Sequence, residues 1–385
     1  MILGIDASTI RSGGGLSHLA GVLRGASPRD FGFEGVHVWC NPTVADYLKS
    51  FSLPDIHLWC QEELTGSLWR LARWQMRGWS KRLSQTGVNV LWSPGGLTGW
   101  IPPWIPLVAL SQNLLPFEPS EMARYGLAPI RFKFLLLRQI QLGAFKKANG
   151  IMFLSKYARD QVVRCIPEIA AKAIVIPHGI DRALYRLPRK PAWNGDKPVR
   201  LLYVSTVDMY KHQWHVVTAV QKLLLQNYNV ELDLVGSAYP PALRKLNKSR
   251  DSFPALAAKV HYRGPVCHAE LSALYHQADI FVFASTCETI SFIVLEAMAA
   301  GLPIACSNRQ PMPEVLGDAG MYFDPEQPGE IAGAIKSLID HPEQAFQLAQ
   351  KAHERAIGYS WKRCADETFA FIAQTMENNY RQKEN

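Results

Sequence analysis

Hydrophobic and polar positions follow two alternating patterns along the second half of the chain. Short runs of β-branched and aromatic residues are each followed by longer stretches whose apolar positions recur every three or four residues. The runs predict strands at 199–205, 230–236, 260–264, 280–284 and 303–307, and the stretches between them predict helices. Strands that alternate with helices in this way form a parallel sheet covered by helices on both faces.

The first half repeats this pattern less regularly. A short apolar strand at 1–8 leads to three glycines at 13–15, and helical spacing follows at 16–23. Strand, glycine turn and helix begin a nucleotide-type unit, because glycine lets a ligand approach the backbone; a simple tight turn explains the glycines equally well. Further strands are expected at 36–40, 88–93, 107–110 and 150–154.

A segment without periodicity, 187–198, separates the two halves and is rich in Pro, Lys, Gly and Asn. We therefore expect a first domain at 1–187, a second at 188–358 and a terminal helical segment at 359–385. Ligands of parallel sheets bind at the carboxyl ends of strands. Two such domains facing each other would place the site in the cleft between them.

One helix carries the main chemical signal. After the predicted strand 280–284, a polar loop contains Glu288, and a helix runs from its expected N-cap, Ser291, as far as Gly301. Because this helix is apolar all round, its only ionisable residue, Glu296, needs hydrogen-bond partners or a raised pKa. A helix start favours phosphate and carboxylates bind hydroxyls, so the pattern predicts a site for a phosphorylated polyol. Glu288 alone would also fit an ordinary surface loop.

Composition indicates the class of protein and the cellular compartment. Hydrophobic residues make up 48% and charged residues 19%, which is typical of a globular chain. The seven cysteines are scattered and odd in number, without C-x-x-C, which argues against a disulfide framework or zinc site and for a reducing compartment. We expect neither a signal peptide nor a membrane-spanning helix, and hence a cytoplasmic location.

Positive charge is concentrated in the first half. Residues 1–185 hold 20 Lys and Arg against 12 Asp and Glu, whereas the remainder is balanced at 21 against 21. This asymmetry predicts an anionic partner, which could be a lipid surface, nucleic acid or polyphosphate.

The stretch 68–83 predicts one amphipathic helix. Its apolar face holds Leu68, Leu71, Ala72, Met76, Trp79 and Leu83, its basic face holds Arg70, Arg73, Arg77 and Lys81, and Trp69 and Trp74 lie on the flanks. A surface helix that solvates its arginines fits, and so does a helix lying on an anionic membrane. A second basic and apolar helix, expected at 131–148 with its leucine face buried, favours the membrane.

Several motifs occur in an order that resembles the family 4 (group 1) glycosyltransferases of the GT-B fold, and the likeness covers most of the chain. The glycine turn matches the first motif, and Glu288-x7-Glu296, followed by A-M-A-x-G-x-P and P-E-V-x-G-D-A-G, matches the most specific one. Between them lie Phe153-Leu-Ser-Lys-Tyr-Ala, Ile176-Pro-His-Gly-Ile-Asp181 and the strand and loop from Tyr203 to Lys211. Tyr359-Ser-Trp361 begins the terminal helix.

The resemblance implies an α/β fold of two Rossmann-like, doubly wound domains facing a central cleft, with the C-terminal helix crossing back to the N-terminal domain. It implies that Glu288 contacts the donor sugar, Glu296 the ribose, and Lys211 the diphosphate, with Lys211 and Glu288 as the catalytic pair. The implied nucleotide-sugar site comprises Gly14, Thr206, Lys211, Val266, Glu288, Ser291, Phe292 and Glu296, and the implied acceptor region comprises Gly13, Gln112 and Asn113.

Two positions depart from the family pattern. Thr206 stands where many members have a phosphate-binding Arg, and His212 or Arg263 could replace that cation. Gln112 stands where many members have a catalytic-region His, and an amide cannot act as a general base. The chain has no D-x-D motif, which fits a metal-independent enzyme without a cofactor.

We therefore expect a retaining glycosyltransferase that moves a sugar from a UDP- or GDP-sugar to a saccharide acceptor. The acceptor is expected to be lipid-linked, as in bacterial O-antigen, lipopolysaccharide or other cell-surface polysaccharide synthesis. The basic first domain would hold the enzyme peripherally at the inner face of the cytoplasmic membrane. A nucleotide-sugar epimerase of the same fold is the alternative enzyme, and a basic nucleic-acid-binding protein is the non-enzyme alternative, although no recognition motif supports it.

Overall fold

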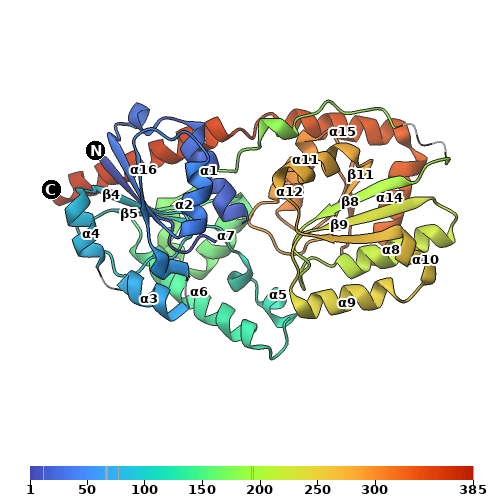
Figure 1. Cartoon of the computed structure of the whole chain (residues 1–385), viewed down its shortest axis with the longest axis horizontal. Coiled ribbons are helices and arrows are strands. Elements are labelled where there is room, and N and C mark those ends of the chain that lie inside the picture. The colour runs from blue at the N-terminus through green and yellow to red at the C-terminus, as the bar shows by residue number, and fades with distance from the viewer. Residues whose placement is uncertain (12, 66–67, 77, 192, 194, 385) are drawn as a thin grey trace. The chain divides into compact units, whose positions relative to one another are not determined.

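A computed structural model describes residues 1–11, 13–65, 68–76, 78–191, 193 and 195–384. The chain divides into two compact units, whose elements are labelled in Figure 1. The first unit comprises Met1–Phe117, Pro129–Gly179 and Ser360–Asn385. The second comprises Glu118–Ala128 and Ile180–Tyr359.

The first unit is built on a seven-stranded sheet in the order β3-β2-β1-β4-β5-β6-β7, and every neighbouring pair is parallel. The strands are β1 (Ile2–Asp6), β2 (Gly35–Cys40), β3 (Ile56–Cys60), β4 (Val90–Ser93), β5 (Leu107–Ser111), β6 (Gly150–Phe153) and β7 (Ala173–Val175). The sequence pattern did not predict the edge strand β3, because its residues are half-buried or exposed.

Seven α-helices of the first unit are described: α1 (Gly14–Gly25), α2 (Pro42–Lys49), α3 (Leu68–Met76), α4 (Trp79–Thr86), α6 (Pro129–Lys147), α7 (Lys156–Cys165) and α16 (Trp361–Glu384). Helix α1 packs tightly against α16, because a Cβ on Gly21 would lie 2.3 Å from the ring of Trp361. The predicted cap of α7 is confirmed, since the Ala158 N–H donates to the Ser155 hydroxyl at 3.1 Å.

The prediction of one helix at 68–83 is wrong. Two helices, α3 and α4, meet at Gly78, whose φ of 93° breaks the helical path. The break changes the buried face: Trp74 is only 3% exposed and lies under the guanidinium of Arg82, while Met76 is 65% exposed. Trp74 therefore belongs to the core and is unsuited to a membrane surface. The expected placements of Arg77 and of the Trp69 side chain lie outside the described residues.

The prediction that helix 131–148 buries its leucine face is also wrong. Along α6, the exposed fractions are 60% for Phe132, 40% for Leu135, 62% for Leu136 and 48% for Ile140. These positions are three, four and eight residues apart, so they share one face of the helix. We name them the α6 apolar stripe.

The second unit contains a six-stranded parallel sheet in the order β10-β9-β8-β11-β12-β13. The strands are β8 (Val199–Val204), β9 (Val230–Val235), β10 (Val260–Gly264), β11 (Ile280–Phe283), β12 (Ile304–Ser307) and β13 (Met321–Phe323). All but the short edge strand β13 were predicted. Strand order reverses between β8 and β11, and such a switch point opens a crevice at the carboxyl ends of the strands.

The helices of this unit are α5 (Pro119–Ala123), α8 (Gln213–Leu225), α9 (Pro240–Arg250), α10 (Pro254–Lys259), α11 (His268–Gln277), α12 (Phe292–Ala299), α13 (Met312–Leu316), α14 (Pro328–Asp340) and α15 (Pro342–Ala356). Figure 1 shows α8 and α9 on one face of the second sheet and α12 and α15 on the other. Helix α12 is buried on all sides, as predicted, with Val294, Leu295 and Ala297 fully inaccessible. The predicted α/β class with two Rossmann-like parallel sheets is confirmed.

One segment departs from the expected domain division. Residues Glu118–Ala128 were assigned to the first domain by their place in the sequence, but they group with the second unit. The boundary between the halves falls at Gly179 and Ile180, earlier than the expected 187. The difference arises because 180–187 pairs with the second unit, as when the Arg186 N–H donates to the Ala299 carbonyl at 2.9 Å.

Candidate active site

The two predicted catalytic residues meet at the switch point of the second sheet. Lys211 follows β8 and Glu288 follows β11, so both leave the carboxyl ends of adjacent strands. The Lys211 ammonium donates to Glu288 Oε1, and the two side chains are only 8% and 16% exposed. The structure therefore brings together a cation suited to phosphate and a carboxylate suited to sugar hydroxyls.

Lys211 is held in place through its backbone and its aromatic neighbours. The Tyr203 hydroxyl donates to the Lys211 carbonyl, and the Lys211 N–H donates to the Asp208 carbonyl at 3.1 Å. Its ammonium lies 4.9 Å from the ring centre of Tyr210 and 5.2 Å from that of Phe283. Surroundings of low polarity strengthen the attraction between this cation and an anionic ligand.

The start of α12 supplies an unsatisfied hydroxyl. Ser291 directly precedes α12 but makes no capping hydrogen bond, so the predicted cap interaction is wrong. Its hydroxyl is fully buried and has no hydrogen-bond partner among the described residues. A buried hydroxyl without a partner is costly, and a ligand phosphate at this helix start would satisfy it. Phe292 is the first residue of α12.

Glu296 lies inside α12 and is only 4% exposed. Burial raises its pKa to about 7, although a hydrogen bond from the Tyr275 hydroxyl to its Oε2, at 2.8 Å, favours the ionised form. The expectation from the sequence, that this carboxylate has partners or a raised pKa, is confirmed on both counts. Near pH 7 the group is therefore poised between its neutral and ionised states.

Thr206 and Val266, also predicted to bind the donor, lie along the same edge of the sheet, whereas the predicted donor residue Gly14 lies in the first unit. Thr206 follows β8 and its hydroxyl lies 3.1 Å from that of Ser237, while Val266 is half-buried just after β10. Neither basic residue considered as a replacement for the missing cation suits that role. Arg263 is paired with Asp233 at 2.7 Å, and burial lowers the pKa of His212 to about 3, so His212 is neutral.

The predicted acceptor residues lie in the first unit. Gly13 has a φ of 67° and precedes α1, which opens at Gly14. Gln112 follows β5 and reaches this turn, because a Cβ on Gly15 would lie 2.8 Å from its Oε1. Its Nε2 is buried and has no partner in the described part of the chain, whereas Asn113 accepts a hydrogen bond from the Leu115 N–H at 3.1 Å.

Sequence reasoning missed several buried polar residues near strand ends. Asp6 ends β1, burial raises its pKa to about 6, and its Oδ1 accepts from the Ser8 N–H at 3.1 Å. The sequence could have pointed to Asp6, because it is an acidic residue at the end of an apolar strand that leads to a glycine turn. His18 and His178 form a buried contact with their Nδ1 atoms 2.8 Å apart, and they are far apart in the sequence, so no local pattern predicts it.

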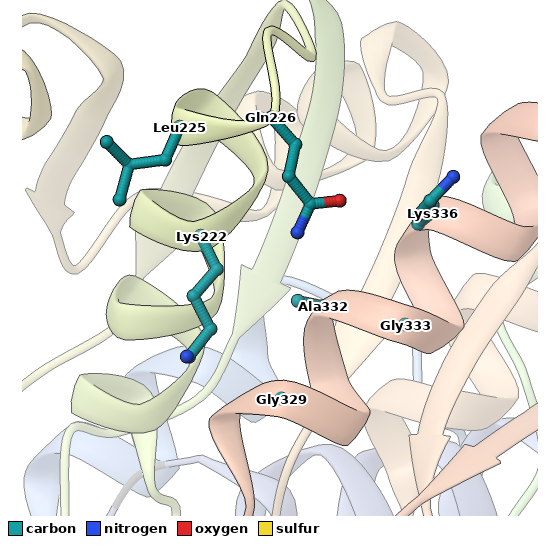
Figure 2. A pocket seen from close by; sticks show the side chains of 7 residues that line it. All are labelled: Lys222, Leu225, Gln226, Gly329, Ala332, Gly333 and Lys336. Carbon is teal, nitrogen blue, oxygen red and sulfur yellow. The ribbon is translucent and has the colours of Figure 1, made fainter.

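A separate groove on the second unit lies between α8 and α14 (Figure 2). It has a volume of about 350 Å³ and is lined by Lys222, Leu225, Gln226, Gly329, Ala332, Gly333 and Lys336. Lys222, Leu225 and Gln226 come from the end of α8 that is remote from Lys211, and the other four residues come from α14. The lining includes no carboxylate. The groove therefore lacks the chemistry of the switch-point site.

Metal-binding groups and membrane-spanning helices are both absent from the described residues. No three His, Cys, Asp or Glu side chains in this part of the chain gather as a metal-binding group. Among the same residues, no helix combines the length and apolar character needed to cross a membrane. All seven cysteines are free thiols.

The fold and the candidate site define a class of protein with two Rossmann-like units and, at the switch point of the second, residues suited to phosphate and hydroxyl groups. Comparison with known proteins shows what the chain is similar to. Residues 198–341 match the model described as glycosyl transferases group 1. The match includes Lys211, Glu288 and Glu296.

Curated relatives are glycosyltransferases. The O-antigen chain mannosyltransferase B of Escherichia coli is 29% identical over 260 residues, which cover 66% of this chain and 65% of the relative. The glycogen synthase of Mycobacterium tuberculosis is 26% identical over 228 residues, which cover 58% of this chain and 53% of the relative. The chain thus spans about half to two thirds of the length of these relatives.

Solved structures share the fold over nearly the whole chain. HepE of Anabaena, solved in complex with UDP-glucose, superposes with a TM-score of 0.75 at 16% identity and covers 98% of this chain and 100% of its own. WaaG, described as a glycosyltransferase involved in lipopolysaccharide biosynthesis, superposes with a TM-score of 0.68 at 13% identity, covering 97% and 99%. The predicted likeness to GT-B glycosyltransferases is confirmed.

Proposed function

We propose that this chain is a glycosyltransferase that moves a sugar from a nucleotide diphosphate sugar to a saccharide acceptor. The observation that carries the proposal is the Lys211–Glu288 contact at the switch point, beside the unsatisfied Ser291 hydroxyl at the start of α12. A diphosphate would take Lys211 and Ser291, and the sugar would take Glu288. The ribose hydroxyls would donate to Glu296.

The chemistry needs no acidic or basic side chain at the reacting carbon. The bond between the sugar C1 and the diphosphate oxygen breaks, a bond from C1 to the acceptor oxygen forms, and the acceptor proton ends on the departing diphosphate. Lys211 and the α12 start stabilise the charge that develops on that leaving group. Gln112 orients hydroxyls but cannot accept the proton, which supports proton transfer to the phosphate and retention of anomeric configuration. We propose that no metal and no cofactor are required.

A panel of nucleotide sugars tests the proposal. Purified protein is incubated with UDP- and GDP-sugars, with and without saccharide acceptors, and the nucleoside diphosphate released is measured. We expect one base and one sugar to be turned over, transfer to exceed hydrolysis once an acceptor is present, and the product to keep the anomeric configuration of the donor by NMR. Conversion of the donor into its epimer without an acceptor would instead identify an epimerase, and no turnover with any donor would refute the proposal.

We further propose that the acceptor is presented at an anionic membrane surface, as a lipid-linked saccharide of a bacterial cell-surface polysaccharide such as O-antigen. The enzyme would then act peripherally at the cytoplasmic face. The α6 apolar stripe supports this, because it exposes four large apolar side chains on one helix face beside Arg131 and the exposed Lys133. Apolar and basic groups on one helix suit the headgroup region of an anionic bilayer.

Flotation with vesicles tests the membrane contact. We expect the wild-type protein to float with vesicles of anionic lipid at low salt and to remain behind with neutral vesicles. The variant Phe132→Ser/Leu136→Ser should lose flotation. The matched control, Leu225→Ser/Ile357→Ser, removes two side chains that are each 63% exposed on the second unit, and it should float like wild type. Equal loss in both variants, or no flotation of wild type, would refute the assignment of α6.

A further inference from the structure

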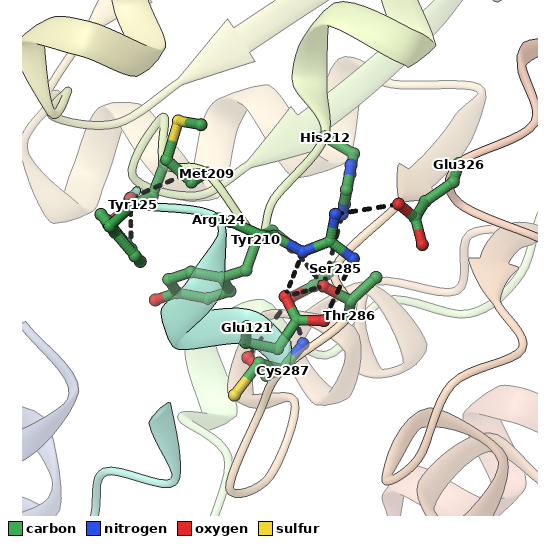
Figure 3. Close-up of polar contacts among 11 residues, drawn as sticks. Glu121, Arg124, Tyr125, Met209, Tyr210, His212, Ser285, Thr286, Cys287 and Glu326 are labelled. Carbon is green, nitrogen blue, oxygen red and sulfur yellow. Dashed lines mark hydrogen bonds and ion pairs between the residues drawn. The ribbon is translucent and has the colours of Figure 1, made fainter. Parts of the chain in front are cut away.

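Residues Glu118–Ala128 form a segment, named here the strap, that belongs to the second unit although its neighbours in the sequence belong to the first. In the sequence it lies between the β5 loop carrying Gln112 and helix α6, both of which belong to the first unit. In the structure it groups with the second unit and contacts the loops that follow β8, β11 and β13 (Figure 3). The loops after β8 and β11 are the ones that carry Lys211 and Glu288.

The strap centres on a buried carboxylate, Glu121. Arg124 donates to it twice, from Nε at 2.7 Å to Oε2 and from Nη2 at 3.2 Å to Oε1. The third guanidinium nitrogen, Nη1, donates to Glu326 Oε1 at 2.8 Å, after β13. The Glu121 side chain is 8% exposed. Glu121 is therefore held by an arginine that is itself fixed by a second carboxylate.

Glu121 binds the loop that carries Glu288. The Thr286 hydroxyl lies 2.6 Å from Glu121 Oε2 and donates to it, because the carboxylate is the nearest acceptor and carries charge. His212 Nε2 lies 3.3 Å from the same hydroxyl oxygen. Since the single Thr286 hydrogen goes to Glu121, His212 Nε2 must be the donor in that contact. The same hydroxyl lies 3.2 Å from the Tyr210 carbonyl oxygen. Thr286, two residues before Glu288, is thus surrounded by Glu121, His212 and Tyr210, which are labelled with it in Figure 3.

The strap also binds the loop that carries Lys211. The Tyr125 hydroxyl donates to Asp208 Oδ1 at 2.7 Å, and the same oxygen accepts from the Met209 N–H at 2.6 Å. The Thr286 N–H donates to the Tyr210 carbonyl at 2.9 Å, which ties the two loops to each other. One short segment thus fixes the residues on both sides of the Lys211–Glu288 contact.

Stability does not explain this arrangement, because a buried ion pair commonly adds little compared with apolar residues of the same shape. Geometry explains it better. We infer that Glu121 is a positioning residue: through Thr286 it holds Glu288 where the donor sugar binds, and Tyr125 does the same for the Lys211 loop. The inference rests on the proposed function: it assigns Glu121, acting through Thr286, to recognition of the sugar, whereas Tyr125 supports the loop whose Lys211 meets the diphosphate.

Three substitutions separate positioning from folding. Glu121→Gln keeps the shape but turns an amide toward Arg124, Thr286→Val removes the hydroxyl, and Thr286→Ser retains it. For the first two, we expect the dissociation constants of UDP or GDP to change less than about twofold, while kcat/KM for the matching nucleotide sugar falls about ten- to one-hundredfold, mainly in kcat. Thr286→Ser should behave like wild type.

The matched control is Glu231→Gln, which breaks an ion pair with Lys259 at the amino end of β9 and should leave every parameter unchanged. Equal losses in nucleotide and nucleotide-sugar binding for Glu121→Gln would show a merely structural role. Unchanged turnover in both Glu121→Gln and Thr286→Val would show that the strap positions nothing. Either result overturns the inference.

Hydrogen exchange supplies a readout that does not depend on activity. Glu121→Gln and Thr286→Val should speed amide exchange across 285–288 and 208–212, and leave β9 unchanged. If wild type neither binds nor turns over any nucleotide sugar, the proposed function fails, and exchange still decides whether the strap holds the two loops. Unchanged exchange in both loops would overturn the inference independently.

Discussion

Glu296 gives the sharpest test of the site, because its burial predicts both a stability profile and a ligand profile. Its pKa is raised from 4.5 to about 7 by burial in α12. Below pH 4.5 the carboxyl is protonated in both the folded and the unfolded chain, so its raised pKa does not lower the free energy of unfolding. As the pH rises through 7, the unfolded chain ionises readily while the folded one resists, so folding stability is lost.

The magnitude follows from the two pKa values. Each pH unit between 4.5 and about 7 costs about 1.4 kcal/mol, so the loss levels off near about 3 kcal/mol above pH 7. Glu296→Gln keeps the shape and the acceptor for the Tyr275 hydroxyl but cannot ionise. For a unit of 150–250 residues, about 3 kcal/mol corresponds to a Tm higher by about 6 to 12 °C.

The assay compares the Tm of wild type and Glu296→Gln by scanning calorimetry from pH 5 to pH 9. We expect near-equal values at pH 5 and a widening advantage for Glu296→Gln that saturates above pH 7. Tyr275→Phe removes a hydrogen bond that favours the ionised form, so the pKa of Glu296 should rise further. The stability of this variant should therefore keep falling to a higher pH, and the total loss should be larger than in wild type. Parallel Tm curves for wild type and Glu296→Gln would refute the reasoning.

Ligand binding should have the opposite pH dependence. Ribose hydroxyls donate to an ionised carboxylate, so the affinity of wild type for UDP or GDP should rise as the pH passes 7. Glu296→Gln should bind more weakly and without this rise. A Gln variant that keeps the wild-type pH profile of nucleotide affinity would exclude Glu296 from the nucleotide site, whatever its effect on Tm.

Three further predictions follow from single contacts. Lys211→Ala and Glu288→Ala should each lower the rate of sugar transfer about one-hundredfold or more, while circular dichroism shows a folded protein. The double variant should lose little more, because paired residues act as a unit. Unchanged turnover in either single variant would refute the proposed role of that residue. Gln112→Ala should raise KM for the acceptor and leave donor hydrolysis unchanged, and an effect on hydrolysis alone would contradict this. Gly21→Ala should destabilise the first unit by about 1–3 kcal/mol through overpacking against α16, whereas Gly143→Ala, which has open space, should stabilise it by about 0.5–1 kcal/mol in urea unfolding.

The regular part of the fold was predictable, because buried strands of a parallel sheet are apolar throughout and their neighbours are helical. Five of the six strands of the second sheet follow from this signal alone. The exceptions have physical causes. β3 and β13 are short edge strands with partly exposed residues, and their pairing depends on a neighbour rather than on their own pattern.

Helix faces were less predictable than helix positions. The wheel for 68–83 assumed an unbroken helix. The chain instead turns at the left-handed Gly78, and Trp79 and Arg82 of α4 pack on Trp74 of α3, while Met76 is exposed. For α6, periodicity alone could not show that the side chains of Phe132 and Leu136 are exposed. A wheel identifies residues that share a face, and only tertiary packing decides whether that face is covered.

The candidate site was predictable in its residues but not in its connections. Lys211, Glu288 and Glu296 were found from local motifs, and the structure brings the first two into contact. The role of Glu121 carries no local signal, because Thr286 lies 165 residues away in the sequence. Long-range polar contacts of this kind depend on the fold.

The Lys211–Glu288 contact also bears on the position where the family's arginine is absent. With Thr206 there and His212 neutral, Lys211 is the cation that the described site offers a diphosphate, and Glu288 already neutralises it. A nucleoside diphosphate that captures Lys211 leaves the Glu288 carboxylate half-buried without its cation, which is unfavourable. A nucleotide sugar supplies hydroxyl donors to that carboxylate at the same moment. The sugar should therefore contribute more to binding here than in a site with a second cation, and the geometry of Glu288, set through Thr286 and the strap, decides which sugar can do so.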